Sequence, residues 1–241
     1  MSDHGSAAMQ SEEVNGLALR AELYGLFSAA FRDPDPIYPD AERFKALWSL
    51  FPVPGDFPPF KKIAPEDSET EFRRLFGFNL SPDCPPYETH YEAAGIFRKT
   101  QTLADLAGFY RAFGVDLAPG DRRSDHLPVE LEFLSLLLHK QARAAARGDD
   151  AKAVIARHAR VKFLGEHLTV WMPSFASAVI GKGTQGCYEL LVRRLAAFIA
   201  FDALSLGIDL KVSTTTPGDA GIDEGIDEGC ASCAGGENAC A

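Results

Sequence analysis

The sequence lacks the features of an exported, membrane-spanning or disulfide-bonded protein. Its first residues, MSDHGSAAMQSEEVNG, contain neither a basic segment nor an apolar core, so we expect no signal peptide. No run approaches the roughly 18 apolar residues that a bilayer span requires. Three of the five cysteines, Cys230, Cys233 and Cys240, lie close together near the C-terminus, unlike the even spacing of a disulfide framework. These absences predict a cytoplasmic protein without stable membrane insertion.

Positive charge is scarce, above all near the C-terminus. The chain has 24 Lys and Arg against 34 Asp and Glu, a formal net charge of −10. No Lys or Arg follows Lys211, whereas the acidic residues after it are Asp219, Asp223, Glu224, Asp227, Glu228 and Glu237. A general nucleic-acid binder needs a basic face that replaces counterions on phosphate. We therefore expect no nucleic-acid partner.

Motifs of nucleophilic or nucleotide chemistry are also absent. The sequence contains no GxSxG, no Walker A loop and no GxGxxG between a strand and a helix. The run GKGT at 181–184 lacks the spacing of a phosphate loop and a preceding strand, so we interpret it as a helix–helix turn. Cys84 and Cys187 have no recognisable partner histidine and are interpreted as ordinary thiols. We expect the chain not to be an enzyme.

Hydrophobic residues, in contrast, are plentiful and follow a helical period. They make up 46% of the 241 residues, enough for one domain with a core that needs neither metal nor disulfide. Apolar positions recur at steps of three and four, and we find no convincing alternating strand. The predicted fold class is all-α, a single helical bundle over residues 13–211. Residues 1–12 are expected to be a disordered lead and residues 212–241 a disordered acidic tail.

Proline and glycine set the expected helix boundaries. A proline removes a backbone donor and restricts the residue before it. We expect the run WMP at 171–173 to interrupt the sixth helix and residues 175–180 to add one or two turns, with the longest loops at 52–66 and 79–98. The predicted helices are 11–32, about 40–51 with Asp40 as its cap, 67–78, 99–114, 125–147, 149–170 and 184–206.

The most informative segment is SDHLPVELEF at 124–133. Asp125 is expected to cap the following helix, and Pro128 falls in its first turn, where a missing N–H costs little. Glu130 lies four residues after His126, on the same face. One interpretation is a capped helix with a surface His–Glu pair. The other places Asp125 and His126 beside a groove, where they bind a ligand's polar or cationic groups and where alanine replacements would leave thermal stability nearly intact.

Two metal hypotheses are weaker. His126 and Glu130 have helical metal-ligand spacing but lack the second histidine of HExxH and any evident third ligand. His139, His158 and His167 are expected to be surface or satisfied core residues. In the tail, Cys230 and Cys233 form a CxxC with Cys240 further on, a pattern that binds metal or forms a disulfide. The alternative for this segment is a solvated tail without such a role.

Aromatic residues are numerous, with seventeen Phe, six Tyr and two Trp. Most of them can fill the core of a helical bundle. Those next to proline-rich breaks could instead line a groove for an apolar peptide, because rings supply large contact area at low entropic cost. These residues are Trp48, Phe51, Phe57, Phe60, Phe76, Tyr87 and Tyr91.

Three motifs together resemble the TorD/DmsD/NarJ family of redox-enzyme maturation chaperones. They are CPPYE at 84–88, LADLAGFYRAFG at 103–114 and DHLPVELEF at 125–133, in the family's order and spacing. The helical domain of that family would cover roughly residues 15–208. The form of CPPYE is similar to the subgroup that serves type II DMSO-reductase-like enzymes, such as ethylbenzene dehydrogenase or selenate and chlorate reductases.

The resemblance implies a function. Such chaperones bind the catalytic subunit of a molybdenum oxidoreductase, some of them its twin-arginine signal peptide, and delay export until the bis-molybdopterin guanine dinucleotide cofactor is inserted. The chaperone itself holds no molybdenum or other cofactor, and family members occur as monomers or domain-swapped dimers.

The resemblance also assigns candidate residues. By motif match, Asp125 and His126 correspond to residues implicated in signal-peptide binding, and Tyr87 and Glu88 lie in the loop near that groove. Glu130 and Tyr91 complete the expected client-binding set. We expect carboxylates here to face arginines of the client and rings to face its apolar segment. The acidic tail is not part of the family pattern.

Overall fold

The computed structural model is a bundle of helices, and its described residues are 3–32, 41–53, 65–77, 84–92, 96–117 and 123–210. Within these ranges there is no strand, only one isolated β-bridge, so the all-α fold class is confirmed. None of the helices there is both long enough and apolar enough to cross a bilayer. The expected tail, residues 212–241, lies outside the described part of the chain, so its boundary stays a prediction.

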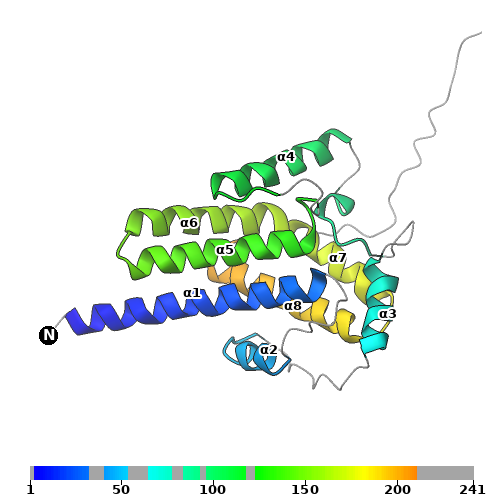
Figure 1. Cartoon of the computed structure of the whole chain (residues 1–241), viewed down its shortest axis with the longest axis horizontal. Helices are drawn as coiled ribbons and strands as arrows, with labels where there is room; N and C mark the ends of the chain where they lie inside the picture. The colour runs from blue at the N-terminus through cyan, green and yellow to red at the C-terminus, as the bar shows by residue number, and fades with distance from the viewer. Residues whose placement is uncertain are drawn as a thin grey trace, which may run out of the picture.

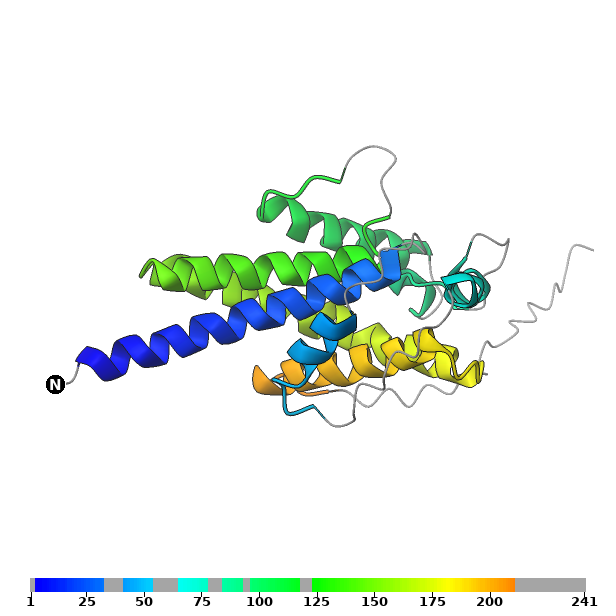
Figure 2. The same ribbon diagram turned by 60° about the horizontal axis from the view of Figure 1, so that its bottom comes forward.

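Long helices run side by side through the bundle (Figure 1). The pairs with the most extensive contact are α1 (Asp3–Arg32) with α5 (Leu127–Ala146), α5 with α6 (Asp150–Phe163), and α7 (Thr169–Gly181) with α8 (Cys187–Ser205). The shorter α2 (Ala41–Trp48) and α3 (Pro65–Phe76) contact α1 and α8 respectively. Figure 2 shows α4 (Ile96–Ala112) outside this bundle, on the side of α5 away from α8.

The contact between α1 and α5 follows from small side chains and an apolar stripe. Tyr24 and Phe27 of α1 are fully buried, as the periodicity predicts. Two serine hydroxyls then join the helices: Ser28 donates to the carbonyl of Pro128 at 2.8 Å, and Ser135 donates to that of Ala21 at 2.7 Å. Since these hydroxyls satisfy backbone acceptors across the interface, the two helices approach closely without burying an unpaired polar group.

Several predicted boundaries are confirmed, but the predicted start of α1 is wrong. α1 ends at Arg32 as expected, but it begins at Asp3, so residues 3–12 of the predicted disordered lead are helical. Gly114 and Gly148 follow α4 and α5 with φ of 75° and 68°, the left-handed conformation that ends helices. Asp149 caps α6, accepting from Lys152 N at 3.2 Å, which agrees with the predicted start at residue 149. Asp40, the predicted cap of α2, lies outside the described residues.

The predicted break at residues 171–173 is wrong. The chain stays helical from α6 through a π-helical segment, η2 (Leu164–Leu168), into α7, which contains Pro173. An interior proline costs about 3 kcal/mol. However, Trp171, Met172 and Phe175 around it are buried, and each contributes about 2 kcal/mol by burial. Packing therefore outweighs the lost hydrogen bond.

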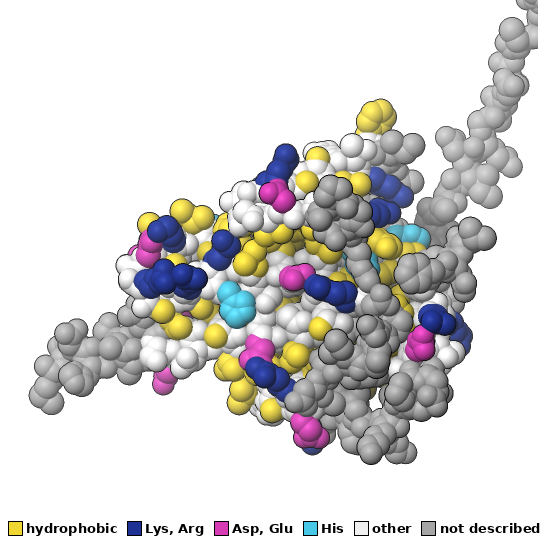
Figure 3. Space-filling view, in the orientation of Figure 1, with side chains coloured by type: hydrophobic (Ala, Val, Ile, Leu, Met, Phe, Trp, Pro, Cys, Tyr) yellow, Lys and Arg dark blue, Asp and Glu magenta, His cyan; other side chains and the backbone are white. Residues whose placement is uncertain are grey.

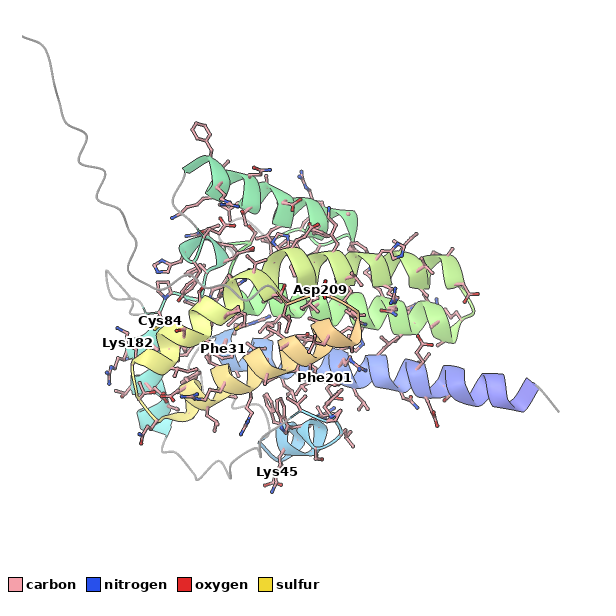
Figure 4. The ribbon with its side chains drawn as sticks, turned by 180° about the vertical axis from the view of Figure 1, so that it is seen from behind. Phe31, Lys45, Cys84, Lys182, Phe201 and Asp209 are labelled. Atoms are coloured by element: carbon pink, nitrogen blue, oxygen red, sulfur yellow. The ribbon has the colours of Figure 1, made fainter. Side chains whose placement is uncertain are left out.

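Aromatic rings fill the core between α2, α3 and α8. Phe51 meets Phe198 and Phe201 at centroid distances of 5.2 and 6.2 Å, and Figure 4 shows Phe201 on the side of α8 that faces α2, with Lys45 pointing away from the bundle. Trp48 and Phe76 are buried here too, so their predicted role in lining a groove is wrong. Phe57 and Phe60 lie outside the described residues.

A buried carboxylate ties three helices together. Asp202 of α8 is fully buried and accepts from Arg20 Nε at 3.2 Å, Tyr24 Oη at 3.0 Å and Arg160 Nη2 at 3.4 Å. Burial raises the pKa of Tyr24, and the neighbouring Asp202 raises it further. Burial also lowers the pKa of Arg160, opposed by Asp202. The charge of Asp202 is thus paired at the junction of α1, α6 and α8.

Candidate functional site

The loop at residues 84–91 is attached by its backbone to the start of α5. Leu127 N donates to Pro86 O at 2.9 Å, and Glu88 N donates to Asp125 O at 3.0 Å. These bonds flank the one described β-bridge, an antiparallel pair of Tyr87 and His126. The loop therefore has a fixed register against α5, and the CPPYE and DHLPVE motifs meet although they are about forty residues apart.

Asp125 holds this junction together from inside. Its carboxylate is fully buried and accepts from Thr89 Oγ1 at 2.7 Å and Thr89 N at 3.3 Å. Arg123 donates to both of its oxygens, from Nε at 3.0 Å and Nη2 at 2.8 Å. The predicted cap is wrong: His126 is the N-cap residue of α5 and makes no side-chain cap bond, because the Asp125 carboxylate turns toward the loop instead.

Glu130 is likewise inside the protein, so the predicted surface His126–Glu130 pair is wrong. Its Oε2 accepts from Trp171 Nε1 at 3.1 Å, while its Oε1 is buried without a hydrogen-bond partner in the described structure. Burial raises the pKa of Glu130 well above its usual value, and the nearby Glu88 raises it further. A carboxyl in this environment favours its neutral form.

Glu88 contacts His167, which the sequence predicted only to be a surface or satisfied core residue. His167 Nδ1 lies 3.0 Å from Glu88 Oε1 and 3.1 Å from Oε2, and both side chains are almost fully buried. Burial raises the pKa of Glu88, opposed by the hydrogen bond and charge of His167. The other ring nitrogen, Nε2, lies 3.6 Å from Oδ2 of the half-exposed Asp105. No local pattern marks His167, since its role depends on the π-helical turn that carries it.

Aromatic side chains and one guanidinium form the outer part of the site. Tyr87 is half-buried, with its ring centroid 4.9 Å from that of His126 and 4.8 Å from the guanidinium carbon of Arg123. The Arg123 side chain is 54% exposed. Tyr91 stacks on Trp171 at 5.7 Å, and burial raises the pKa of Tyr91. The site is thus a shell of rings and Arg123 over buried carboxylates.

The structure brings all the predicted client-binding residues into this one cluster, but with different exposure. Asp125, His126, Glu130 and Glu88 are buried, whereas Tyr87 and Tyr91 are half-buried. Because four hydrogen bonds converge on the Asp125 carboxylate, we now expect alanine at position 125 to lower stability. Their contact with a client stays a prediction.

The metal hypotheses gain no support from the described residues. No group of three or more His, Cys, Asp or Glu side chains in those ranges could hold a metal ion, so the His126–Glu130 pair has no third ligand there. Cys230, Cys233 and Cys240 lie outside the described residues, and the tail hypothesis stays a prediction.

Comparison with family models gives one match. The model described as nitrate reductase delta subunit matches residues 58–177, about half of the chain. This range contains the loop at 84–91, the start of α5 and the π-helical segment that together form the site.

Relatives at 29–40% identity are named as chaperones. The perchlorate reductase assembly chaperone protein of Dechloromonas aromatica is 31% identical over 137 residues, 56% of this chain and 59% of that one. The selenate reductase assembly chaperone protein of Thauera selenatis is 40% identical over 74 residues, 30% and 37% of the two chains. Chaperone protein TorD of Vibrio cholerae is 29% identical over 120 residues, 48% and 52%.

The matched segments thus span between about a third and three fifths of these relatives. Their names describe chaperones and not catalysts, in agreement with the expectation that the chain is not an enzyme. Among solved structures, a redox enzyme maturation protein from Archaeoglobus fulgidus is similar at a TM-score of 0.46 and 23% identity, covering 75% of this chain and 93% of that one.

Proposed function

Because this chain belongs to the TorD/DmsD/NarJ family of redox-enzyme maturation chaperones, we propose that it binds the catalytic subunit of a molybdenum oxidoreductase in the cytoplasm. Binding assists insertion of the bis-molybdopterin guanine dinucleotide cofactor and delays export until the enzyme is loaded. The recognised segment of the client is its twin-arginine signal peptide. The perchlorate, selenate and chlorate reductase chaperones among the relatives favour a client of that type.

One observation carries the assignment of the binding site. Arg123 donates two hydrogen bonds to the Asp125 carboxylate, its guanidinium carbon lies over the Tyr87 ring, and more than half of its side chain is exposed. This is the arrangement in which a guanidinium is bound most strongly, by a bidentate carboxylate and an aromatic face. Arg123 therefore occupies the position that an arginine of the client would take.

Exchange of one arginine for another avoids the main energetic obstacle. Leaving the buried Asp125 carboxylate unpaired would cost several kcal/mol, about 3 to 5 in comparable cases. If a client arginine replaces Arg123, Asp125 and Thr89 keep their donors throughout. Arg123 itself moves into solvent, where its charge is hydrated. The ring of Tyr87 then remains as the contact for the client.

The apolar part of the client has complementary side chains nearby. Tyr87 and Tyr91 are the half-buried rings of the loop, and Tyr91 lies against the buried Trp171. Rings at the mouth of a site supply contact area without ordering long flexible side chains. In a client, an arginine would face the Asp125 carboxylate, and the apolar stretch after it would face the rings of Tyr87 and Tyr91.

A pair of synthetic peptides tests the proposal. The first has two adjacent arginines followed by an apolar segment, and the second has lysines at the same two positions. Calorimetry with the full chain should give tighter binding of the arginine peptide, because lysine cannot form the planar fork. Tyr87→Leu should weaken binding of the arginine peptide. Phe97→Leu, which changes a ring that is 91% exposed on α4, is the matched control and should not.

Equal affinity for the two peptides, or indifference to Tyr87→Leu, would remove the arginine site from the proposal. Co-purification of the tagged chain from its native host, with mass spectrometry, tests the client itself. The expected partner is a molybdoenzyme catalytic subunit, enriched over a Tyr87→Leu sample. Its absence from both samples would contradict the proposed function as a whole.

A further inference from the structure

A second surface, at the far end of α5, is unrelated to the site around Asp125. A cavity of about 340 Å³ lies between the end of α4 and the turn that joins α5 to α6. We call it the α5–α6 groove. Its apolar lining includes Phe113, Ala144 and Ile155, and Ile155 is 60% exposed. From Leu127 to Arg143 along α5 is about 24 Å, so the groove is well separated from the client site.

The rim of the groove is basic. Lys140, Arg143, Arg147 and Lys152 line it, and Asp149 is the one carboxylate among the lining residues. Asp149 pairs with Lys152, which leaves three cations whose side chains form no ion pair with any described residue. Figure 3 shows Lys and Arg side chains gathered with hydrophobic ones at the end of the bundle where α5 meets α6. In a chain of net charge −10, this local excess of positive charge is unusual.

The C-terminal segment of the same chain is complementary to this surface in charge and in apolar character. Its last thirty residues contain no Lys or Arg, and their four-residue repeat reads GIDEGIDE at 221–228. Ile222 and Ile226 are the large apolar residues of this segment, each followed by Asp and Glu. The repeat therefore offers two aliphatic side chains, each followed by two acidic groups. That pattern matches an apolar floor with a cationic rim.

Chain length allows the repeat to reach the groove. Ile208 lines a cavity with Val161 and Gly165, so the described chain ends against α6, and Figure 4 shows Asp209 there. Val161 and Lys152 are about 14 Å apart along that helix, and a helix is about 10 to 12 Å wide. The fourteen positions from Ile208 to Ile222 span up to about 45 Å when extended.

We propose that the acidic segment 219–228 of this chain binds in its own α5–α6 groove. Ile222 and Ile226 contact the apolar lining near Phe113 and Ile155, and the carboxylates that follow each isoleucine face Lys140, Arg143 and Arg147. Because a short linker joins the segment to the domain, its effective concentration at the groove is about millimolar. Weak contacts are therefore enough for the segment to bind. Bound there, the segment covers apolar surface that a second acidic, apolar chain would otherwise contact. This inference does not depend on the identity of the client.

Paramagnetic labelling of the full chain tests the proposal. Cys84 and Cys187 are buried, so a thiol-specific nitroxide in the variant Cys233→Ser/Cys240→Ser attaches at Cys230, two residues beyond the repeat. At low salt, amide signals of residues 140–156 should broaden selectively. Exposed charge pairs are screened by salt, with a Debye length of about 10 Å at 0.1 M and 3 Å at 1 M. The broadening should therefore diminish strongly at high salt.

Two double variants test separately the electrostatic and the apolar contacts of the segment with the groove. Arg143→Glu/Arg147→Glu should abolish the selective broadening, and so should Ile222→Ser/Ile226→Ser, which leaves the charge unchanged. Arg73→Glu/Arg74→Glu, an equal change at two exposed positions of α3, is the matched control and should leave it intact.

Three outcomes would overturn the proposal. The first is broadening that is absent or spread evenly over the surface. The second is selective broadening that survives both groove and isoleucine variants. The third is broadening of an isotope-labelled, spin-free chain mixed with an unlabelled spin-carrying chain, since the groove would then take a second copy instead of its own tail.

Discussion

His167 Nδ1 lies 3.0 Å from Glu88 Oε1, although 79 residues separate them in the chain. The contact joins the π-helical segment between α6 and α7 to the loop that carries the CPPYE motif. A π-helical turn widens the helix and changes the direction of the side chains that follow, and such turns are frequent at functional sites. Here it places an imidazole against a buried carboxyl, so the position of the loop at residues 84–91 depends on the conformation of a distant helix.

Replacing His167 should therefore loosen the loop. His167→Leu leaves Glu88 buried without its main partner, and we expect the free energy of unfolding to fall by about 2 kcal/mol or more. Urea denaturation at pH 7 measures it. The double variant with Glu88→Gln should lose less than the sum of the single changes, because the two residues interact. His139→Leu, at an exposed position of α5, serves as the control and should have little effect.

The raised pKa of Glu130 leads us to expect a specific dependence of stability on pH. Its pKa is raised in the folded protein, so the folded state holds a proton that the unfolded chain has already lost. The resulting stabilisation is complete below about pH 4.5, the pKa of an unfolded glutamate, and is lost as pH rises through the folded pKa. Glu130→Gln keeps an oxygen for Trp171 Nε1 and removes the charge.

The difference in melting temperature, Glu130→Gln minus wild type, should therefore grow from pH 5 to pH 8. Glu88 also has a raised pKa, so the variant should retain part of the pH dependence. A difference that is constant over this range, or that shrinks with pH, would show that Glu130 is not the group responsible.

Arg123 should behave as an internal competitor of the client. Arg123→Gln removes the fork from Asp125, so the variant should melt at a lower temperature when no peptide is present. The arginine peptide should then raise its melting temperature more than it does for wild type, because the peptide restores the missing guanidinium. Calorimetry should show several-fold tighter binding. Weaker binding by Arg123→Gln would mean that Arg123 contacts the peptide itself, while leaving client binding in place.

Asp202 should be among the most sensitive positions for stability. Asp202→Asn keeps the size of the side chain but leaves Arg160 buried without its carboxylate, which should cost about 3 kcal/mol. Chemical denaturation measures the change. Glu132→Gln breaks an ion pair with Arg32 in which both side chains are more than half exposed, so its cost should be much smaller. Comparable costs for the two variants would contradict the role of Asp202 as the junction of α1, α6 and α8.

Local sequence was informative where local forces decide the outcome. Helical periodicity predicted α1, which buries Tyr24 and Phe27, glycine predicted the ends of α4 and α5, and the start predicted at residue 149 agrees with the cap of α6. Three motifs, by resemblance, indicated the family that the family model and the relatives then supported. Each of these depends on a few neighbouring residues or on a short motif.

Local reasoning failed where a distant partner outweighed a nearby one. Asp125 could have capped α5, but its carboxylate bonds Thr89 and Arg123 instead. Pro173 was expected to interrupt a helix, yet buried side chains around it hold the helix together. In both cases, spacing along the chain carried no information about the competing contact.

The sequence by itself determined that this chain forms helices, where most of them end, and which motifs identify its family. Only the tertiary structure decided that Glu130 and Asp125 are buried, that His167 contacts Glu88, and that Arg123 pairs with the Asp125 carboxylate. The physical reason is that periodicity, caps and turns act over a few residues, whereas the burial and pairing of a charged group depend on every element packed around it.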